Sequence, residues 1–438
     1  MEQLRRREVL AGVGGLGSLV ASRIIGPGRP LSSPPTLTTD VSDGIWPQFG
    51  HDARRSGYTS DPGPTLPLEK QWRVELDRQP EWVRGSGAGP IVGDHHVYAL
   101  ESDALVALDR DTGTEQWRFH PPVVTEPVSV RGLGTPSLGS GDGPINVGER
   151  LAYRDGRVFL EGGQWTEISV LYAIDAESGT MEWAVPGASE PILLGEVLLC
   201  SMSFDGSNAA LINAQTGRIR EKFDAFLRYW PGAFVGHDLS IEAIRAKTDE
   251  FGLSNGYRRF DPELVVPTSA GTDIALFQPD FQTPAITTDG LALSAPGQVI
   301  NGDGDTSQYM AVLDLQNGEF QPLQESGLWN TQVVTDNERW YIVGHGAVVS
   351  YRVREPGDGD QIKEWETDIS EPVGKPAVTG TALYVPIPDG ILALDPASGE
   401  RLAEQGPGVE ATHWKHPAVV AGETLYRRTS DGTLYAYR

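Results

Sequence analysis

The stretch that decides the fold of this 438-residue chain is ALDRDTGTEQW at residues 107–117, because it recurs along the chain. The other copies are AIDAESGTMEW at 173–183, LINAQTGR at 211–218, VLDLQNG at 312–318, ALDPASGE at 393–400, and a stretched copy from Val349 to Trp365. Copies that return at intervals of about 40 residues indicate a repeat architecture, in which one supersecondary unit is built several times.

Each copy predicts a β-hairpin. An apolar strand ends at Asp or Asn, whose side chain can bond the amides of a tight turn, and a glycine then takes a backbone conformation that other residues resist. The returning strand carries a tryptophan, which offers a large area for packing one sheet on the next. The residues assigned to this repeat are Asp109, Gly113, Trp117, Asp175, Gly179, Trp183, Gly217, Asp314, Gly318, Trp365, Asp395 and Gly399.

Two further strands are predicted upstream of each hairpin, as in PAVTGTALYV at residues 376–385 and PAVVAGETLY at residues 417–426. Four strands in a unit of about 40 residues make a propeller blade, so the fold class is an all-β propeller. The hairpins predict seven four-stranded blades. Eight are the alternative, because the gap between Asn213 and Asp314 is long enough for another blade, but helical spacing over residues 240–251 favours a loop there.

The two ends of the propeller are predicted to share one blade. The chain stops at TLYAYR, residues 433–438, which supplies a third strand without a fourth. Near the start, LEKQWRVEL at residues 68–76 is a lone tryptophan-bearing strand. We expect this strand to pair with the C-terminal blade and close the ring, which would hide edges that otherwise invite aggregation.

The N-terminal region predicts export. Three arginines at residues 5–7 precede a glycine-rich, weakly apolar run of about 13 residues, which is shorter than the ~20 residues of a membrane-spanning helix. This pattern resembles a twin-arginine (Tat) signal. We therefore expect a Tat-like signal peptide or anchor at residues 1–26 and a Pro/Ser/Thr-rich linker at 27–43. The propeller is expected at 44–438, with irregular insertions at about 120–150 and 224–282, outside the cytoplasm at the cell surface or secreted.

The composition is acidic and poor in lysine. The formal net charge is −25, and only six residues are lysine. This pattern favours a halophilic protein, since molar salt shortens the Debye length to about 3 Å and screens the self-repulsion. It excludes nucleic acid as a partner, because phosphates require a basic surface. The single cysteine, Cys200, excludes an internal disulfide and is expected in the core.

The hairpin motif, together with WPQFGHD at residues 46–52 and SGY at 56–58, resembles the pyrroloquinoline-quinone (PQQ)-like propeller repeat over residues 46–438. For the dehydrogenases of this family, the resemblance implies a quinone at the channel, a calcium ion held by carboxylate and amide groups, a catalytic Asp, and often a ring of two adjacent cysteines. The single cysteine excludes that ring, and no calcium or base motif of the family is matched. PQQ is therefore not expected, and no cofactor is predicted.

The chain also resembles the propeller of the bacterial outer-membrane assembly machinery, which implies interaction through the loops between blades. We therefore expect an extracytoplasmic binding or protein-interaction scaffold, monomeric, whose partner is another envelope or extracellular protein or a small ligand. It would touch a membrane only through an uncleaved N-terminal anchor. The alternatives are a small-molecule- or sugar-binding propeller and a PQQ-dependent oxidoreductase. An enzyme is the less favoured class, and no catalytic residue is assigned.

Side chains where the innermost strands begin should ring the mouth of the channel, where propellers usually bind ligands. The candidates for ligand binding are Arg84, Glu190, Lys375, Trp414 and His416, with an ordinary polar lining as the alternative.

A calcium loop is a second candidate, and its residues are Asn301, Asp303 and Asp305, which alternate as calcium ligands do. Position six of that loop is Thr306 instead of glycine, and position twelve is Val312 instead of glutamate. Turn chemistry explains this stretch equally well, so no metal site is assigned and calcium stays the alternative.

Overall fold

The computed structural model describes residues 41–77, 89–122, 146–163, 169–202, 209–223, 265–267, 274–278, 285–289, 291–300, 306–314, 320–323, 331–344, 346–355, 361–370, 372, 374–388, 390–405, 416–429 and 431–438. All of them belong to the unit Leu37–Arg438. The predicted signal, most of the predicted linker and the predicted helix at 240–251 lie outside these residues.

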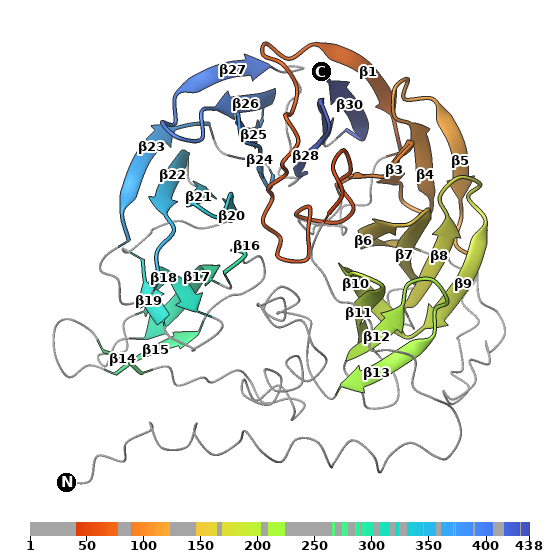
Figure 1. The fold of residues 1–438 in the computed structure, drawn as a ribbon, viewed down its shortest axis with the longest axis horizontal. Helices are drawn as coiled ribbons and strands as arrows, with labels where there is room; N and C mark the ends of the chain where they lie inside the picture. Colours follow the sequence, from red (N-terminus) through yellow and green to blue (C-terminus); the bar gives the residue numbers. More distant parts are fainter. Residues whose placement is uncertain are drawn as a thin grey trace, which may run out of the picture. The chain divides into compact units, whose positions relative to one another are not determined.

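The described residues form an all-β propeller of thirty strands in seven antiparallel sheets, which we call blades 1–7 (Figure 1). Blade 1 contains β2 (Ile91–Val92), β3 (His96–Leu100), β4 (Leu105–Asp109) and β5 (Glu115–Phe119). Blade 2 contains β6 (Asn146–Arg154), β7 (Arg157–Gly163), β8 (Val170–Asp175) and β9 (Met181–Pro186). Blade 3 contains β10 (Ala188–Leu194), β11 (Val197–Met202), β12 (Ala209–Asn213) and β13 (Ile219–Phe223).

Blades 4 to 7 complete the series. Blade 4 contains β14 (Val265–Pro267), β15 (Ile274–Gln278), β16 (Ala285–Ile286), β17 (Leu291–Ile300), β18 (Thr306–Asp314) and β19 (Phe320–Pro322). Blade 5 contains β20 (Gln332–Thr335), β21 (Arg339–Gly344), β22 (Ala347–Arg352) and β23 (Lys363–Asp368). Blade 6 contains β24 (Ala377–Val378), β25 (Leu383–Ile387), β26 (Gly390–Leu394) and β27 (Arg401–Gln405), and blade 7 contains β28 (Ala418–Ala421), β29 (Thr424–Arg428), β30 (Thr433–Tyr437) and β1 (Lys70–Glu75).

The predicted pairing of the two ends is confirmed. Strand β1 lies antiparallel to β30, with Trp72 opposite Ala436 and Glu75 opposite Thr433. The fourth strand of blade 7 therefore comes from the beginning of the propeller sequence. The ladder between β1 and β30 covers an edge of β30 that the C-terminal blade would otherwise present to solvent.

Blade 4 differs from the others because its central hairpin is long. One end of β17 pairs with β16, where Leu293 lies opposite Ala285. The other end pairs with β15, where Ile300 lies opposite Leu276. Two added strands, β14 and β15, thus extend this blade within the stretch predicted as an insertion at 224–282. Among the described residues, the gap between Asn213 and Asp314 holds the last strand of blade 3 and the strands of blade 4, and no eighth blade.

The repeated hairpin has the predicted geometry. In blade 1, Asp109 Oδ1 accepts hydrogen bonds from the Thr112 amide at 2.9 Å and the Thr112 hydroxyl at 2.7 Å. The same pattern recurs at Asp175 in blade 2 and Asp395 in blade 6. The turn glycine Gly113 has a φ of 71°, which a side chain would resist.

A tryptophan from one blade docks on the turn glycine of the next blade. A Cβ atom at Gly113 would lie 2.7 Å from the Trp72 ring, and one at Gly179 would lie equally close to Trp117. The indole also donates to the next turn, since Trp72 Nε1 lies 3.0 Å from the carbonyl oxygen of Arg110. We call this contact the Trp–Gly dock. Its four pairs within the described part of the chain are Trp72 with Gly113, Trp117 with Gly179, Trp183 with Gly217 and Trp365 with Gly399.

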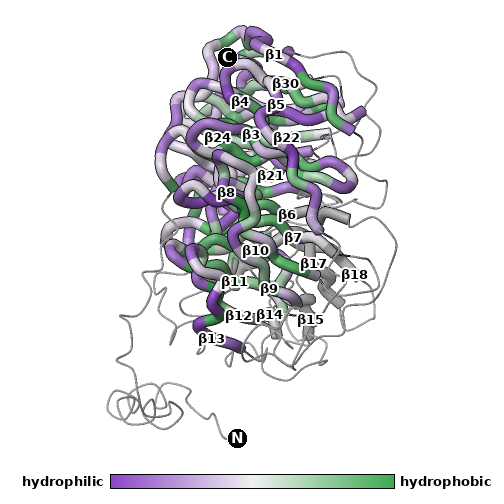
Figure 2. The backbone as a smooth tube through the Cα atoms, turned by 90° about the vertical axis from the view of Figure 1, so that its right-hand side faces the viewer, coloured by the Kyte–Doolittle hydropathy of each residue, from purple (hydrophilic) through white to green (hydrophobic). Residues whose placement is uncertain are grey.

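The core lies within and between the blades. Every residue of β3 and β25 is buried, and Figure 2 shows hydrophobic stretches inside the sheets and hydrophilic turns between them. Cys200 is buried between blades 2 and 3, as predicted, because it packs with the apolar side chains of both blades. Burial raises the pKa of its thiol well above the ordinary value, so Cys200 behaves as a core residue.

Candidate functional site

The centre of the propeller is occupied by residues 41–63, which we call the lead-in segment and which is coloured red in Figure 1. It hydrogen-bonds to each blade in turn, in the order of the chain. The contacts are Trp46 with Val92, Pro47 with Tyr153, Gln48 with Leu193, Arg54 with Ile286, Ser56 with Thr335, Gly57 and Thr59 with Val378, and Gly63 with Gly422. One segment thus connects all seven blades.

These contacts gather at one end of the innermost strands. Val92, Ile286, Thr335 and Val378 are the last residues of β2, β16, β20 and β24. The lead-in segment therefore covers the ends of the inner strands with the chain's own backbone. The predicted ligand residues lie toward the beginnings of these strands, which is the opposite end.

Two aspartates hold the lead-in segment in shape. Asp52 Oδ1 accepts from the Ser56 amide at 3.0 Å, and Asp52 Oδ2 accepts from the Ser56 hydroxyl at 3.1 Å and from Arg54 Nη2 at 3.0 Å. Asp61 accepts from the Gly44 amide at 2.9 Å and from the Gly422 amide of blade 7 at 2.6 Å. Charged acceptors make such bonds stronger than neutral ones, so the fold of the segment is fixed at two points.

Lys375, a predicted ligand residue, is enclosed against the lead-in segment. Its Nζ donates to the carbonyl oxygen of Val333 at 2.7 Å and lies 5.7 Å from the centre of the Phe49 ring. Its exposed fraction is 1%. Burial, together with the nearby Arg55 guanidinium, lowers the pKa of Lys375 to about 7, and Asp52 opposes the shift. The amino group of Lys375 is therefore buried and hydrogen-bonded within the protein, and it does not face the mouth of the channel.

Glu190, the second described candidate, lies in β10 at a φ of 51°, a left-handed conformation unusual for glutamate. Its carboxylate accepts from the Ser201 hydroxyl at 3.0 Å, and its amide donates to Glu161 at 3.0 Å. Burial raises the pKa of Glu161 above the ordinary value. The two glutamates thus form a polar cluster between β7 of blade 2 and β10 of blade 3.

His416, the third described candidate, precedes β28. Burial and the charges of Arg428 and Arg427 lower its pKa to about 3, which keeps the imidazole neutral. Its Nδ1 is enclosed and has no hydrogen-bond partner among the described residues. No hydrogen bond or ion pair between described residues joins His416 to Glu190 or Lys375. The remaining candidates, Arg84 and Trp414 and the calcium candidates Asn301, Asp303 and Asp305, lie outside the described residues.

Arg55 of the lead-in segment interacts electrostatically with two of the predicted residues, Glu190 and Lys375, although the sequence did not single it out. Burial and the charge of Arg150 lower the pKa of Arg55, and Glu190 opposes that shift. Arg55 in turn lowers the pKa of Lys375. The signal available in the sequence was the placement of Arg55 between the two recognised motifs of the lead-in segment, WPQFGHD and SGY.

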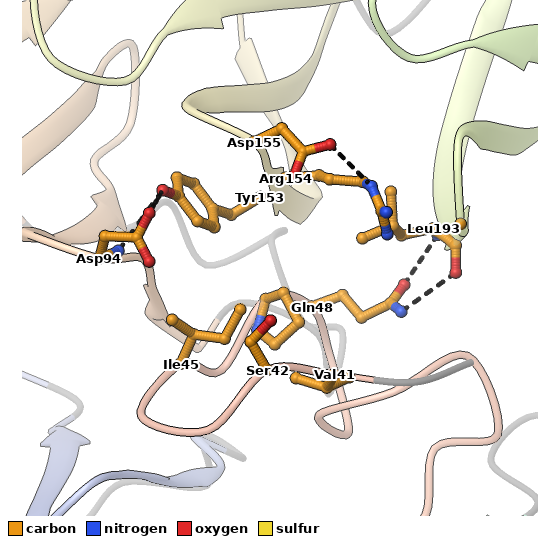
Figure 3. Close-up of a pocket in the computed structure, with 11 residues that line it drawn as sticks. Val41, Ser42, Ile45, Gln48, Asp94, Tyr153, Arg154, Asp155 and Leu193 are labelled. Carbon is orange, nitrogen blue, oxygen red and sulfur yellow. Dashed lines mark hydrogen bonds and ion pairs between the residues drawn. The ribbon is translucent and has the colours of Figure 1, made fainter. Parts of the chain in front are cut away.

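A pocket of about 290 Å³ opens beside the lead-in segment where blades 1, 2 and 3 meet it (Figure 3). Asp94 and Tyr153 lie on one side of it, with the tyrosine hydroxyl donating to Asp94 Oδ2 at 2.7 Å. Burial and this carboxylate raise the pKa of Tyr153 to about 12. On the other side Arg154 Nε donates to Asp155 at 3.1 Å. The pocket combines charged groups of both signs with an apolar wall.

Two negative findings concern the described residues only. No group of three His, Cys, Asp or Glu side chains in this part of the chain is placed to hold a metal ion. Within the same residues, no helix has the length and hydrophobicity that a membrane span needs.

Comparison with known proteins identifies the repeat. Residues 69–222 match the family described as outer membrane protein assembly factor BamB. The repeats within residues 69–222 are thus of the PQQ-like propeller type, as the hairpin motif predicted. No curated protein matches the sequence.

Several solved structures are similar to this chain at low identity. A europium-containing methanol dehydrogenase is 13% identical, with 90% of this chain and 98% of that chain covered and a TM-score of 0.49. BamB from Moraxella catarrhalis is 14% identical, with coverages of 85% and 97% and a TM-score of 0.37. The quinohemoprotein alcohol dehydrogenase ADHIIG from Pseudomonas putida HK5 is 15% identical, with coverages of 90% and 80% and a TM-score of 0.47.

Proposed function

We propose that this chain is an exported propeller that acts as a protein-binding scaffold in the cell envelope. The observation that carries the proposal is the lead-in segment, which hydrogen-bonds to all seven blades and covers one end of the inner strands. A substrate cannot use that end of the channel without displacing these bonds. We therefore assign recognition to the outer surface and its loops rather than to that end of the channel.

The family match supports the same role. Residues 69–222 match a family named for assembly of outer membrane proteins, a task that consists of contacts between proteins. The Tat-like sequence at residues 1–26 supports export of a folded domain. The net charge of −25 favours a protein partner that carries basic patches on its surface, because opposite charges steer association.

The described residues give less support to an oxidoreductase. A quinone held by calcium would need converging carboxylate and amide oxygens at the channel. Lys375 is instead enclosed by Val333 and Phe49, and the Glu190 carboxylate is bonded to Ser201. The residues described at the inner strands therefore do not fit that group, and we assign no step through it.

Affinity purification tests the scaffold. The tagged full chain, crosslinked in its native envelope at working salt, should retain a defined protein partner in stoichiometric amount. That partner should bind the purified propeller again after both are isolated. An excess of untagged propeller should reduce the amount of partner that the tagged propeller retains. Purified propeller that retains no protein, but oxidises alcohols with a dye acceptor once PQQ and calcium are added, would replace the scaffold with the oxidoreductase.

A second experiment tests export. Replacing the three arginines at residues 5–7 by lysine keeps the charge but removes the twin-arginine feature. The variant should accumulate in the cytoplasm, while the unaltered chain reaches the envelope, as measured by cell fractionation. Equal export of both chains would contradict a Tat-like route.

A further inference from the structure

The pocket in Figure 3 places opposite charges on its two sides. Asp94 comes from the turn between β2 and β3, and the Arg154 guanidinium lies across from it at the end of β6. Val41, Ile45 and Leu193 line the space between them. Its volume of about 290 Å³ lies at the lower end of the range for ligand pockets, so it suits a molecule the size of an amino acid.

The acidic side is held in place. Tyr153 donates to Asp94 Oδ2 at 2.7 Å, and its ring stacks on Tyr98 at a centroid distance of 5.7 Å. Tyr98 is itself anchored, because its hydroxyl donates to the carbonyl oxygen of Ala176 at 3.3 Å. The second carboxylate oxygen, Asp94 Oδ1, has no hydrogen-bond partner among the described residues. A fixed carboxylate with one open oxygen is a good acceptor for an ammonium group.

The basic side of the pocket has hydrogen-bond donors that no described residue accepts from. The Arg154 guanidinium uses Nε to bond the neighbouring Asp155 at 3.1 Å, and its side chain is 27% exposed. Asp155 is 77% exposed, so this is a surface ion pair that contributes little to stability. Neither Nη atom of Arg154 has a hydrogen-bond partner among the described residues. Two adjacent Nη groups match the two oxygens of a carboxylate.

We propose that this pocket binds a small zwitterion of the α-amino acid class, with its ammonium group on Asp94 and its carboxylate on Arg154. A ligand with one charge would engage only one of these two groups, and a neutral ligand would engage neither charge. The wall of Val41, Ile45 and Leu193 suits an aliphatic side chain. Ser42, which also lines the pocket, offers a hydroxyl to either end of the ligand.

Calorimetry on the full chain tests the ligand class without any mutation. The twenty common amino acids are titrated first, and leucine is then compared with its two halves, 3-methylbutylamine and 4-methylpentanoate. Leucine should bind saturably, and each half should bind at least tenfold more weakly. The proposal is overturned if none of the twenty binds saturably, or if either half binds as tightly as leucine.

Two variants test the assigned contacts. Asp94→Asn keeps an acceptor for Tyr153 but loses the charge, and Arg154→Gln loses the guanidinium; each should weaken leucine binding at least tenfold. Arg157→Gln is the control, because Arg157 follows on the next strand, pairs with Glu182 and does not line the pocket. It should leave the affinity unchanged. Unaltered affinity in both pocket variants, with circular dichroism showing folded protein, would overturn the assignment.

Discussion

The rim and the centre of this propeller are built in different ways. At the rim, the Trp–Gly dock joins neighbouring blades by the same local contact, repeated at four junctions. At the centre, the lead-in segment joins all seven blades, through backbone hydrogen bonds to six of them and through the Gln48 side chain to blade 3. Damage to one dock should remain local, as in other repeat proteins, whereas damage to the lead-in segment should affect several blades together.

Blade 4 sharpens this contrast. The junctions on its two sides lack the dock, because neither β13 of blade 3 (IREKF) nor β19 of blade 4 (FQP) carries a tryptophan. Blades 4 and 5 instead pack through a cluster that includes Leu293, Met310 and the fully buried Trp340. The carbonyl oxygen of Arg54 also accepts from the Ile286 amide of this blade. Blade 4 therefore relies more on the centre than the docked blades do.

The largest effect is expected when a dock loses its tryptophan. Trp365→Ala should lower the free energy of unfolding by about 4 kcal/mol, the usual scale for removing a buried tryptophan. Trp365 is 9% exposed, and its Nε1 donates to the carbonyl oxygen of Pro396 at 3.0 Å. Denaturant unfolding at fixed salt measures the change. Leu402→Ala is the control, because Leu402 is 42% exposed on β27, and it should cost less than about 0.5 kcal/mol. Equal losses would contradict the dock.

A smaller effect is expected at the glycine of a dock. Gly179→Ala should cost about 3 kcal/mol, because a Cβ there meets the Trp117 ring at 2.7 Å and the φ of 70° is unfavourable for alanine. Gly156→Ala separates the two causes, since Gly156 has a φ of 74° but no atom within 4 Å of a Cβ. Its cost should be about 1 kcal/mol. Thermal and denaturant unfolding of both variants measure the difference, and equal costs would show that the tryptophan contact adds nothing.

The centre is tested by Gln48→Ala, with an expected loss of about 2 kcal/mol. Gln48 accepts from the Leu193 amide at 2.9 Å and donates to its carbonyl oxygen at 3.4 Å, so its removal leaves two buried backbone groups unpaired. Hydrogen exchange should show faster exchange in blade 4 as well as in blade 3. Gln116→Ala removes a glutamine whose bond is exposed, and it should leave stability and exchange unaltered. Faster exchange confined to blade 3 would contradict a shared centre.

The rim could be predicted from the sequence and the centre could not, for a physical reason. Asp109, Gly113 and Trp117 act within a hairpin and its neighbour, so each leaves a recurring residue type at a fixed spacing. The lead-in segment binds mainly through backbone atoms, which carry no sequence signal. Its motif was recognised, but its route across seven blades was not. Glu190 lies in β10 and Lys375 lies two residues before β24, and the electrostatic interaction of each with Arg55 depends on that route.

The last prediction is that the free energy of unfolding depends on pH through a group at the centre. The pKa of Lys375 is about 7 in the folded protein and about 10.4 in an unfolded chain. Between these values the unfolded state binds more protons, so the free energy of unfolding should rise with pH by as much as about 1.4 kcal/mol per unit. Below pH 7 Lys375 is protonated in both states, so its contribution to the slope should vanish. Denaturant unfolding between pH 6 and 9.5, at constant salt, measures this curve.

Lys375→Met should flatten the rise between pH 7 and 9.5. The slope is the readout and the absolute stability is not, because the substitution also leaves the Val333 carbonyl oxygen without the ammonium donor. Lys363→Met is the matched control, since Lys363 lies on the rim in an ion pair with Glu366. It should keep the rise, because its ammonium group is charged in both states throughout this range. A rise that persists in Lys375→Met would place its origin away from the centre.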